Sequence, residues 1–200
     1  LGSLTPLLSS HLPHVQQCAL SAIANVSFIS GAVGQLASSG ALAHLGQMLF
    51  NAADPESGRT VLTAICNILK DAPYASDALL QVGGHMALLT QLGSPSAEVQ
   101  AQAAQSIGHM CRHGPALSAM LHADTIPLLS KLLYSPHPGA QLQAVYAIGI
   151  MAAEDEAAAS AVALAGAVSP LTTLLLSSSS VDVKQHLTSA LAHVIRGEWR

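Results

Sequence analysis

The 200-residue sequence has little charge, few aromatic residues and no evident pairing among its cysteines. Lys and Arg number 7 and Asp and Glu number 11, and the resulting net charge of −4 gives no field that would attract nucleic acid. We therefore expect no nucleic-acid partner. Aromatic residues make up only 3% of the chain and alanine is its commonest residue, which favours closely packed helices over strands. The predicted fold class is all-α.

Long apolar runs are also missing, although the mean hydropathy is +0.45. A membrane-spanning helix needs about 20 mainly apolar residues, whereas the uncharged stretches 15–49 and 157–176 are interrupted by glycine, proline or polar residues. We expect no membrane span. Cys18, Cys66 and Cys111 are odd in number and far apart, and no secretory leader is visible, which predicts reduced thiols. We expect an intracellular, cytoplasmic protein, with cytoskeletal, ciliary and nuclear locations left open.

An internal repeat is the main signal in the sequence. A four-residue apolar window occurs five times, and its last positions are 42, 42, 41 and 43 residues apart, at Asn25, Asn67, His109, Ile150 and His193. A second set of leucine-containing segments has the same spacing, and Gly40, Gly83 and Gly166 precede three of them. Two patterns in one register predict a stack of similar helical units.

The sequence resembles the armadillo family of the β-catenin/importin-α superfamily. The resemblance rests on the windows Ala22-Ile23-Ala24-Asn25 and Ala64-Ile65-Cys66-Asn67, which match the family pattern at the end of the third helix, and on the recurring glycines. It implies a right-handed α-solenoid of about five repeats with three helices each. HEAT repeats are the nearest alternative, but they are usually two-helix units with a ladder of Asp and Arg, which this sequence lacks.

The expected repeats form a single solenoid domain over residues 1–200. They cover residues 1–39, 40–82, 83–123, 124–165 and 166–200, approximately. The short first helices of the repeats are predicted at 32–39, 74–82, 115–123 and 155–165. Because the chain begins with Leu rather than Met, we expect it to be part of a longer protein.

Candidate binding residues follow from the repeat alignment, since the third helices of such a solenoid line its concave face. The resemblance implies that the column containing Asn25 and Asn67 holds extended peptide backbone, because an amide both donates and accepts. The column one turn earlier includes Tyr146 but none of the tryptophans found in importin-α, and the column before that includes Gln143 and His186. The predicted partner-binding residues are Asn25, Asn67, His109, His193, Ser21, Thr63, Gln105, Tyr146, Lys70, Arg112 and Arg196.

Two interpretations fit the basic residues Lys70, Arg112 and Arg196, which share one repeat position. They could form a stripe that favours an acidic, extended partner segment. Alternatively, they stabilise the C-terminal ends of their helices through the helix dipole. Replacement of Lys70 and Arg112 by Glu separates the two, because only the first interpretation predicts a change in partner affinity.

Motifs for catalysis or metal binding are weak. His109 and His113 lie four residues apart with Cys111 between them, but the sequence supplies no third ligand nearby. The acidic cluster 154–156 is placed where acids favour a helix N-terminus, and the serines 177–180 suit a turn, although they could also accept phosphate. We expect no metal, cofactor or catalytic residue, and no enzymatic activity.

The sequence therefore predicts a non-catalytic scaffold that binds a partner segment along the groove of its third helices. The alternative is a structural subunit of a large multi-protein assembly such as a ciliary axoneme, and an enzyme is a distant third. No formally charged residue precedes Asp54, and we expect another repeat or a partner in a hetero-complex to cover this uncharged first repeat.

Overall fold

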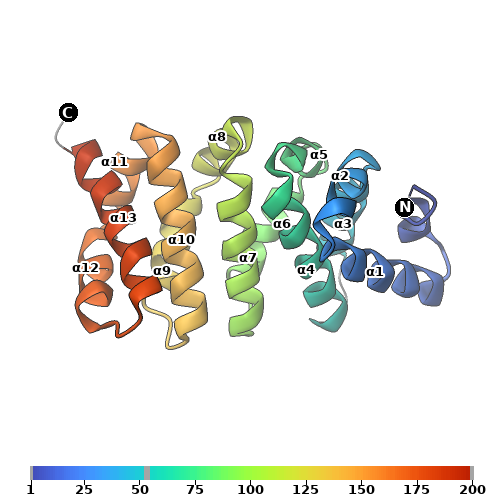
Figure 1. The fold of residues 1–200 in the computed structure, drawn as a ribbon, viewed down its shortest axis with the longest axis horizontal. Coiled ribbons are helices and arrows are strands. Elements are labelled where there is room, and N and C mark those ends of the chain that lie inside the picture. Colours follow the sequence, from blue (N-terminus) through green and yellow to red (C-terminus); the bar gives the residue numbers. More distant parts are fainter. Residues whose placement is uncertain (1, 52–54, 199–200) are drawn as a thin grey trace. The chain divides into compact units, whose positions relative to one another are not determined.

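The computed structural model describes residues 2–51 and 55–198, in which all regular elements are helices. Two compact units make up the chain, residues 1–90 and 91–200. In both units long helices alternate with pairs of shorter ones (Figure 1). The all-α prediction is confirmed.

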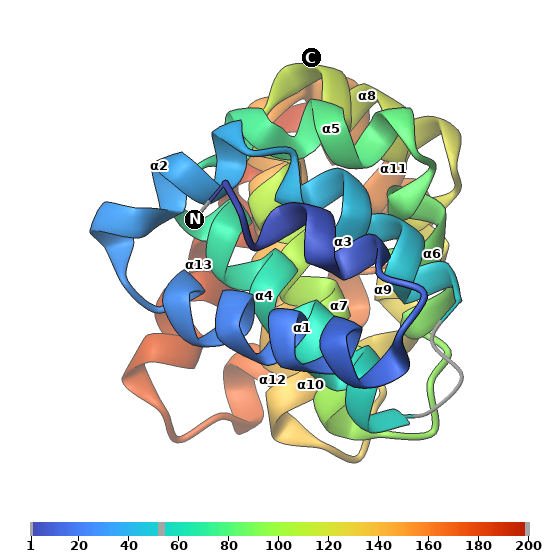
Figure 2. The same ribbon diagram turned by 90° about the vertical axis from the view of Figure 1, so that its right-hand side faces the viewer.

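The first unit contains two long helices that pack against each other, α1 and α4 (Figures 1 and 2). The shorter helices α2 and α3 lie between them in sequence, and both pack on α4. The elements are η1 (Thr5–Ser9), α1 (Pro13–Ser27), α2 (Ser30–Ser38), α3 (Ala41–Phe50), α4 (Pro55–Asp71), η2 (Pro73–Ala75), α5 (Ser76–Gln81) and α6 (Gly84–Gln91), of which α6 ends one residue beyond the division.

The second unit has three long helices, α7, α10 and α13. In Figure 1, α10 lies between the other two and packs against both. The elements are α7 (Ala97–Met110), α8 (Gly114–His122), α9 (Thr125–Leu132), α10 (Pro138–Glu154), α11 (Glu156–Leu164), α12 (Val168–Ser177) and α13 (Val181–Glu198). Each segment predicted as a short first helix is helical within a residue or two of the expected bounds.

Left-handed backbone turns join the first and second short helices. Gly40, Gly83 and Gly166 have φ of 76°, 71° and 73°, the conformation that glycine adopts most readily. In the fourth repeat Asp124, with φ of 52°, takes the place of glycine. Aspartate is one of the few other residues that tolerates this conformation. The recurring glycines of the sequence are therefore explained by backbone geometry.

The turns that lead into the long helices are fixed by serine. The Oγ atoms of four serines each accept a hydrogen bond from the backbone N–H two residues later, always at 3.2 Å. These serines are Ser10, Ser94, Ser135 and Ser178. Such turns satisfy backbone groups that the helix ends leave open. Pro55 and Pro138 are the first residues of their helices, a position that proline tolerates because its missing N–H would have no helical partner there, whereas α7 begins two residues after Pro95, at Ala97.

Ion pairs contribute little to this fold. Arg59 and Glu56 form a salt bridge at 2.6 Å, within one exposed turn of α4. Packing of small and aliphatic side chains therefore supplies most of the stability.

No described helix is by itself long and apolar enough to cross a membrane. Helices α11 and α12 meet that test only together, as a pair bent by 84°.

Close packing at Gly84 gives the first testable prediction. A Cβ at this position would lie 2.5 Å from Cδ1 of Leu79 and 3.1 Å from Cα of Gly46. We expect Gly84→Ala to lower the free energy of unfolding by about 1 to 3 kcal/mol, because a packed neighbour must move. Gly31→Ala is the matched control, since it also lies in the first turn of a helix but has open space around it. Denaturant unfolding measures both, and equal stabilities would contradict the prediction.

Candidate functional site

The long helices of the second unit bring several predicted binding residues together. A pocket of ≈ 210 Å³, which we call the inner pocket, is formed by residues of α7, α10 and α13. Its lining residues are Gln105, His109, Leu142, Gln143, Tyr146 and His186. Gln105, His109 and Tyr146 are predicted candidates. Gln143 and His186 belong to a neighbouring column of the repeat alignment that was not counted among the candidates.

Tyr146 lies at the centre of the inner pocket. Its hydroxyl oxygen is 3.0 Å from Nδ1 of His109, and the two rings meet edge to face with centroids 5.4 Å apart. The His186 ring meets the Tyr146 ring in the same way at 6.1 Å. His109 is buried, Tyr146 is half-buried and His186 is exposed. The three rings thus connect the core of the unit to its surface across three consecutive repeats.

Gly108 makes this arrangement possible. A Cβ there would lie 2.7 Å from Cε1 of Tyr146 and 3.2 Å from Cα of Ala147, closer than unstrained contact allows. Glycine therefore lets α10 approach α7 and brings the Tyr146 ring beside His109. The sequence prediction missed this role. A signal was present, because Gly149 occupies the same place in the next repeat, where a Cβ would lie 3.3 Å from Cβ of Ala190.

The two asparagines of the first unit differ in their surroundings. Asn67 is half-buried, and its Nδ2 donates a hydrogen bond to Oγ of Ser27 at 3.0 Å. That Oγ in turn donates to the carbonyl of Ala24 at 2.7 Å. The amide nitrogen of Asn67 is thus engaged between consecutive repeats, whereas Asn25 is exposed. Asn25 presents more of its amide to solvent than Asn67 does.

Other predicted residues of the first unit lie along α1 and α4. Ser21 is exposed on α1, and Thr63 is half-buried on α4, where its Oγ1 donates to the carbonyl of Arg59 at 3.0 Å. Lys70 is exposed in the last turn of α4. A cation in the last turn of a helix is the position that the helix-dipole interpretation requires.

The basic residues of the second unit are in two different settings. Arg112 is exposed just beyond the end of α7. Arg196 and His193 instead line a small pocket of ≈ 160 Å³ together with the acidic residues 154–156. Since carboxylates face this end of α13, Arg196 contributes less to a basic stripe than the sequence pattern indicates.

Asp155 and Cys111, from the candidate acidic and metal-binding motifs, have roles in the helix ends and the core. Asp155 caps α11, its Oδ1 accepting the Ala158 N–H at 3.0 Å, which confirms that the acidic cluster starts a helix. Burial of Cys111 raises the pKa of its thiol to about 12. Among the described residues no group of three or more His, Cys, Asp or Glu is arranged to hold a metal ion.

Comparisons with known proteins agree with this geometry. A sequence model of HEAT repeats matches residues 86–192. A structure of an engineered protein is 27% identical, with a TM-score of 0.86 over 96% of this chain and 78% of that chain. A designed armadillo repeat protein in complex with the peptide (KR)4 is 25% identical, with a TM-score of 0.86 over 96% of this chain and 81% of the other.

A computationally designed armadillo repeat protein for modular peptide recognition is 26% identical, with a TM-score of 0.85 over 96% of this chain and 81% of that one. A search of curated protein sequences finds no match. The predicted armadillo-type solenoid is confirmed as the fold class.

The hydroxyl of Tyr146 is expected to stabilise the second unit. Tyr146→Phe removes the hydrogen bond to the buried His109 ring, and we expect the free energy of unfolding to fall by about 1 to 2 kcal/mol. Tyr134→Phe is the control, because that side chain is 72% exposed. Urea unfolding of both variants tests the contact. A Tyr146→Phe protein as stable as the control would show that the hydroxyl contributes nothing.

Burial also predicts which thiols react. At pH 8 a thiol with a pKa of about 12 is almost entirely protonated, and the protonated form is a poor nucleophile. We expect an alkylating agent to modify the exposed Cys18 in the folded protein and to spare the buried Cys66 and Cys111. Mass spectrometry before and after denaturation measures this. Rapid modification of Cys111 in the folded protein would contradict its buried position.

Proposed function

This chain belongs to the HEAT-repeat family, and from that membership and the inner pocket we propose that it is a non-catalytic scaffold that binds an extended segment of a partner protein. The two designed armadillo proteins that it resembles are described as binding or recognising peptides. The observation that carries the proposal is the inner pocket, in which polar side chains from three consecutive repeats face the same space. Repeat proteins commonly bind partners on such surfaces.

The chemistry of the inner pocket suits a peptide backbone. The side-chain amides of Gln105 and Gln143 each offer a donor and an acceptor, as an extended chain requires. Tyr146 adds a rigid aromatic surface that is already held in place by His109. A preorganised aromatic side chain loses little conformational freedom when a partner binds. These features support recognition of main-chain groups at this position.

The charge of the surroundings favours an acidic segment. No carboxylate lines the inner pocket, and the exposed Arg112 follows the end of α7, three residues after the lining residue His109. The designed relative bound to (KR)4 recognises a basic peptide; we propose the opposite preference for this chain. Arg112 would add attraction at the end of α7, as the stripe interpretation requires.

A second candidate function, a subunit locked into a hetero-complex, is favoured by the exposed apolar side chains of the first unit. Residues 2–51 carry no formal charge. Several large apolar side chains in this segment are exposed, namely Leu7, Leu12, Phe28, Ile29 and Phe50. Uncharged surfaces with exposed apolar side chains are typical of contacts between proteins.

One experiment distinguishes the two candidates. A library of extended acidic and basic peptides is screened against the purified chain, and hydrogen exchange maps the surface that the best ligand protects. We expect acidic ligands to protect α7, α10 and α13. Protection confined to residues 2–51 would favour the subunit, and selection of basic peptides would contradict the proposed preference.

Variants of the inner pocket make the test quantitative. Gln143→Ala removes an amide from the pocket and is expected to weaken the best peptide roughly fivefold, the effect of about one hydrogen bond. Arg112→Glu is expected to weaken acidic ligands further and to reduce their dependence on salt. Gln81→Ala in the first unit is the control, since its side chain is exposed and lies outside the pocket. Equal binding by Gln143→Ala and the control would exclude the inner pocket.

A further inference from the structure

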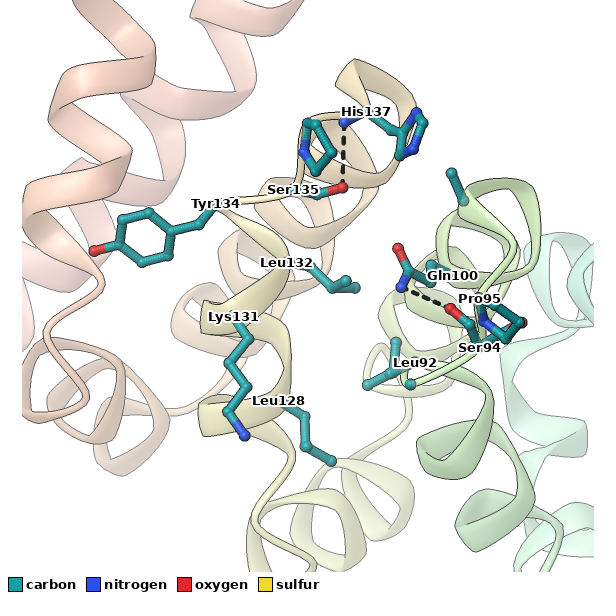
Figure 3. A pocket seen from close by; sticks show the side chains of 13 residues that line it. Leu92, Ser94, Pro95, Gln100, Leu128, Lys131, Leu132, Tyr134, Ser135 and His137 are labelled. Carbon is teal, nitrogen blue, oxygen red and sulfur yellow. Dashed lines mark hydrogen bonds between the residues drawn. The ribbon is translucent and has the colours of Figure 1, made fainter.

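A second pocket of the same unit lies where two turns approach each other, and we call it the turn pocket (Figure 3). Its volume of ≈ 490 Å³ falls within the range of about 300 to 1,000 Å³ that ligand sites occupy. One wall is residues 92–100 and the other is residues 128–137. It shares no lining residue with the inner pocket.

Both walls of the turn pocket are held in place by their own hydrogen bonds. On one wall Gln100 Nε2 donates a hydrogen bond to the carbonyl of Ser94 at 2.8 Å. Oγ of Ser94 accepts a second hydrogen bond, from the backbone N–H of Ser96. On the other wall Oγ of Ser135 accepts the backbone N–H of His137 at 3.2 Å (Figure 3). Pro95 and Pro136 further restrict the two turns. The pocket is therefore largely formed before any ligand arrives.

An apolar floor and a single cation meet on α9. Leu128, Lys131 and Leu132 are three and four residues apart and therefore share one face of that helix. Leu92 lies across from them on the other wall (Figure 3). Figure 3 shows the Lys131 side chain extending beside Leu128. A ligand on this floor would place an aliphatic group and an anionic group next to each other.

The charge at Lys131 is specific to this pocket. Lys131 is the only formally charged residue among those that line the pocket. Within the part of the chain that the structure describes it forms no salt bridge. In the second, third and fifth repeats the equivalent positions are uncharged and are Met48, Gln91 and Leu174. Packing of the repeats therefore does not require this lysine, which is exposed in the last turn of α9.

We propose that the turn pocket binds the carboxyl-terminal end of a protein partner whose last residue is aliphatic. Such a residue carries a hydrophobic side chain and a carboxylate on the same Cα, which matches the adjacency of Leu128 and Lys131. The side chain packs on the leucine floor, and the terminal carboxylate accepts a hydrogen bond from the Lys131 ammonium group. The N-terminal ends of α7 and α10, at Ala97 and next to His137, line the pocket and add positive potential.

Paired peptides test this proposal with the full chain. A fluorescent Gly-Ser-Gly-Val-Leu peptide is compared with the same peptide carrying a terminal amide, and with a free-acid peptide ending in Lys. We expect the free acid ending in Leu to bind about tenfold or more tightly than either of the others, as for a hydrogen bond between charged groups. Fluorescence anisotropy measures the affinities. Equal binding of acid and amide, or no binding of any peptide, would overturn the proposal.

Variants then locate the site. Lys131→Gln should reduce the affinity of the free acid to that of the amide, and Leu128→Gln should weaken both. Lys184→Gln is the matched control, because Lys184 is an exposed lysine of the same unit outside the turn pocket. A loss in this control equal to that of Lys131→Gln would indicate general charge attraction and overturn the site. Gln143→Ala should leave this affinity unchanged, so failure of the inner pocket and failure of the turn pocket remain distinguishable.

Discussion

The close approach of neighbouring long helices is the constraint on which the rest of the structure depends. A short helical repeat cannot bury its own apolar face, so within each unit neighbouring long helices pack against each other. In the second unit this requires small residues at the contact, as at Gly108, against which Tyr146 packs. The same contact brings the tyrosine hydroxyl to the imidazole of His109. The packing of the repeats and the geometry of the inner pocket therefore have one physical cause.

Because charged residues are scarce, neutral polar side chains form many of the hydrogen bonds that fix the helix ends and turns. With only 18 formally charged residues in the chain, helix ends and turns are often satisfied by serine hydroxyls and glutamine amides. Neutral hydrogen-bonding groups also line the inner pocket. Lys131 is the only formally charged residue among those that line the turn pocket, so it sets the sign of the charge that a ligand meets there. Because the chain carries few charges, each one contributes more to which ligands bind.

The helices and the inner face could be predicted because they follow from local pattern. The repeat spacing fixed which residues share a face, so Gln105, His109 and Tyr146 were expected together and line one pocket. The hydrogen bond from Asn67 to Ser27 could not be predicted, because it joins residues 40 positions apart whose side-chain directions depend on the packing distance. The turn pocket was missed for a related reason. Its walls are turns from two repeats, and sequence pattern alone does not place one turn beside another.

Positions that depart from the repeat are the most informative about function. Residues inside the stack must meet the same packing requirement in every repeat, so small or aliphatic residues recur there. A residue departs from the repeat either because the backbone requires it or because its side chain has a contact of its own, and the structure distinguishes these two causes. Asp124 replaces glycine in a left-handed turn and meets a backbone requirement in another way. Lys131 and Tyr146 lie within helices and have ordinary helical backbone, so their explanation lies in what each side chain contacts. For Tyr146 that contact is partly internal, through His109, whereas Lys131 is exposed and lines the turn pocket.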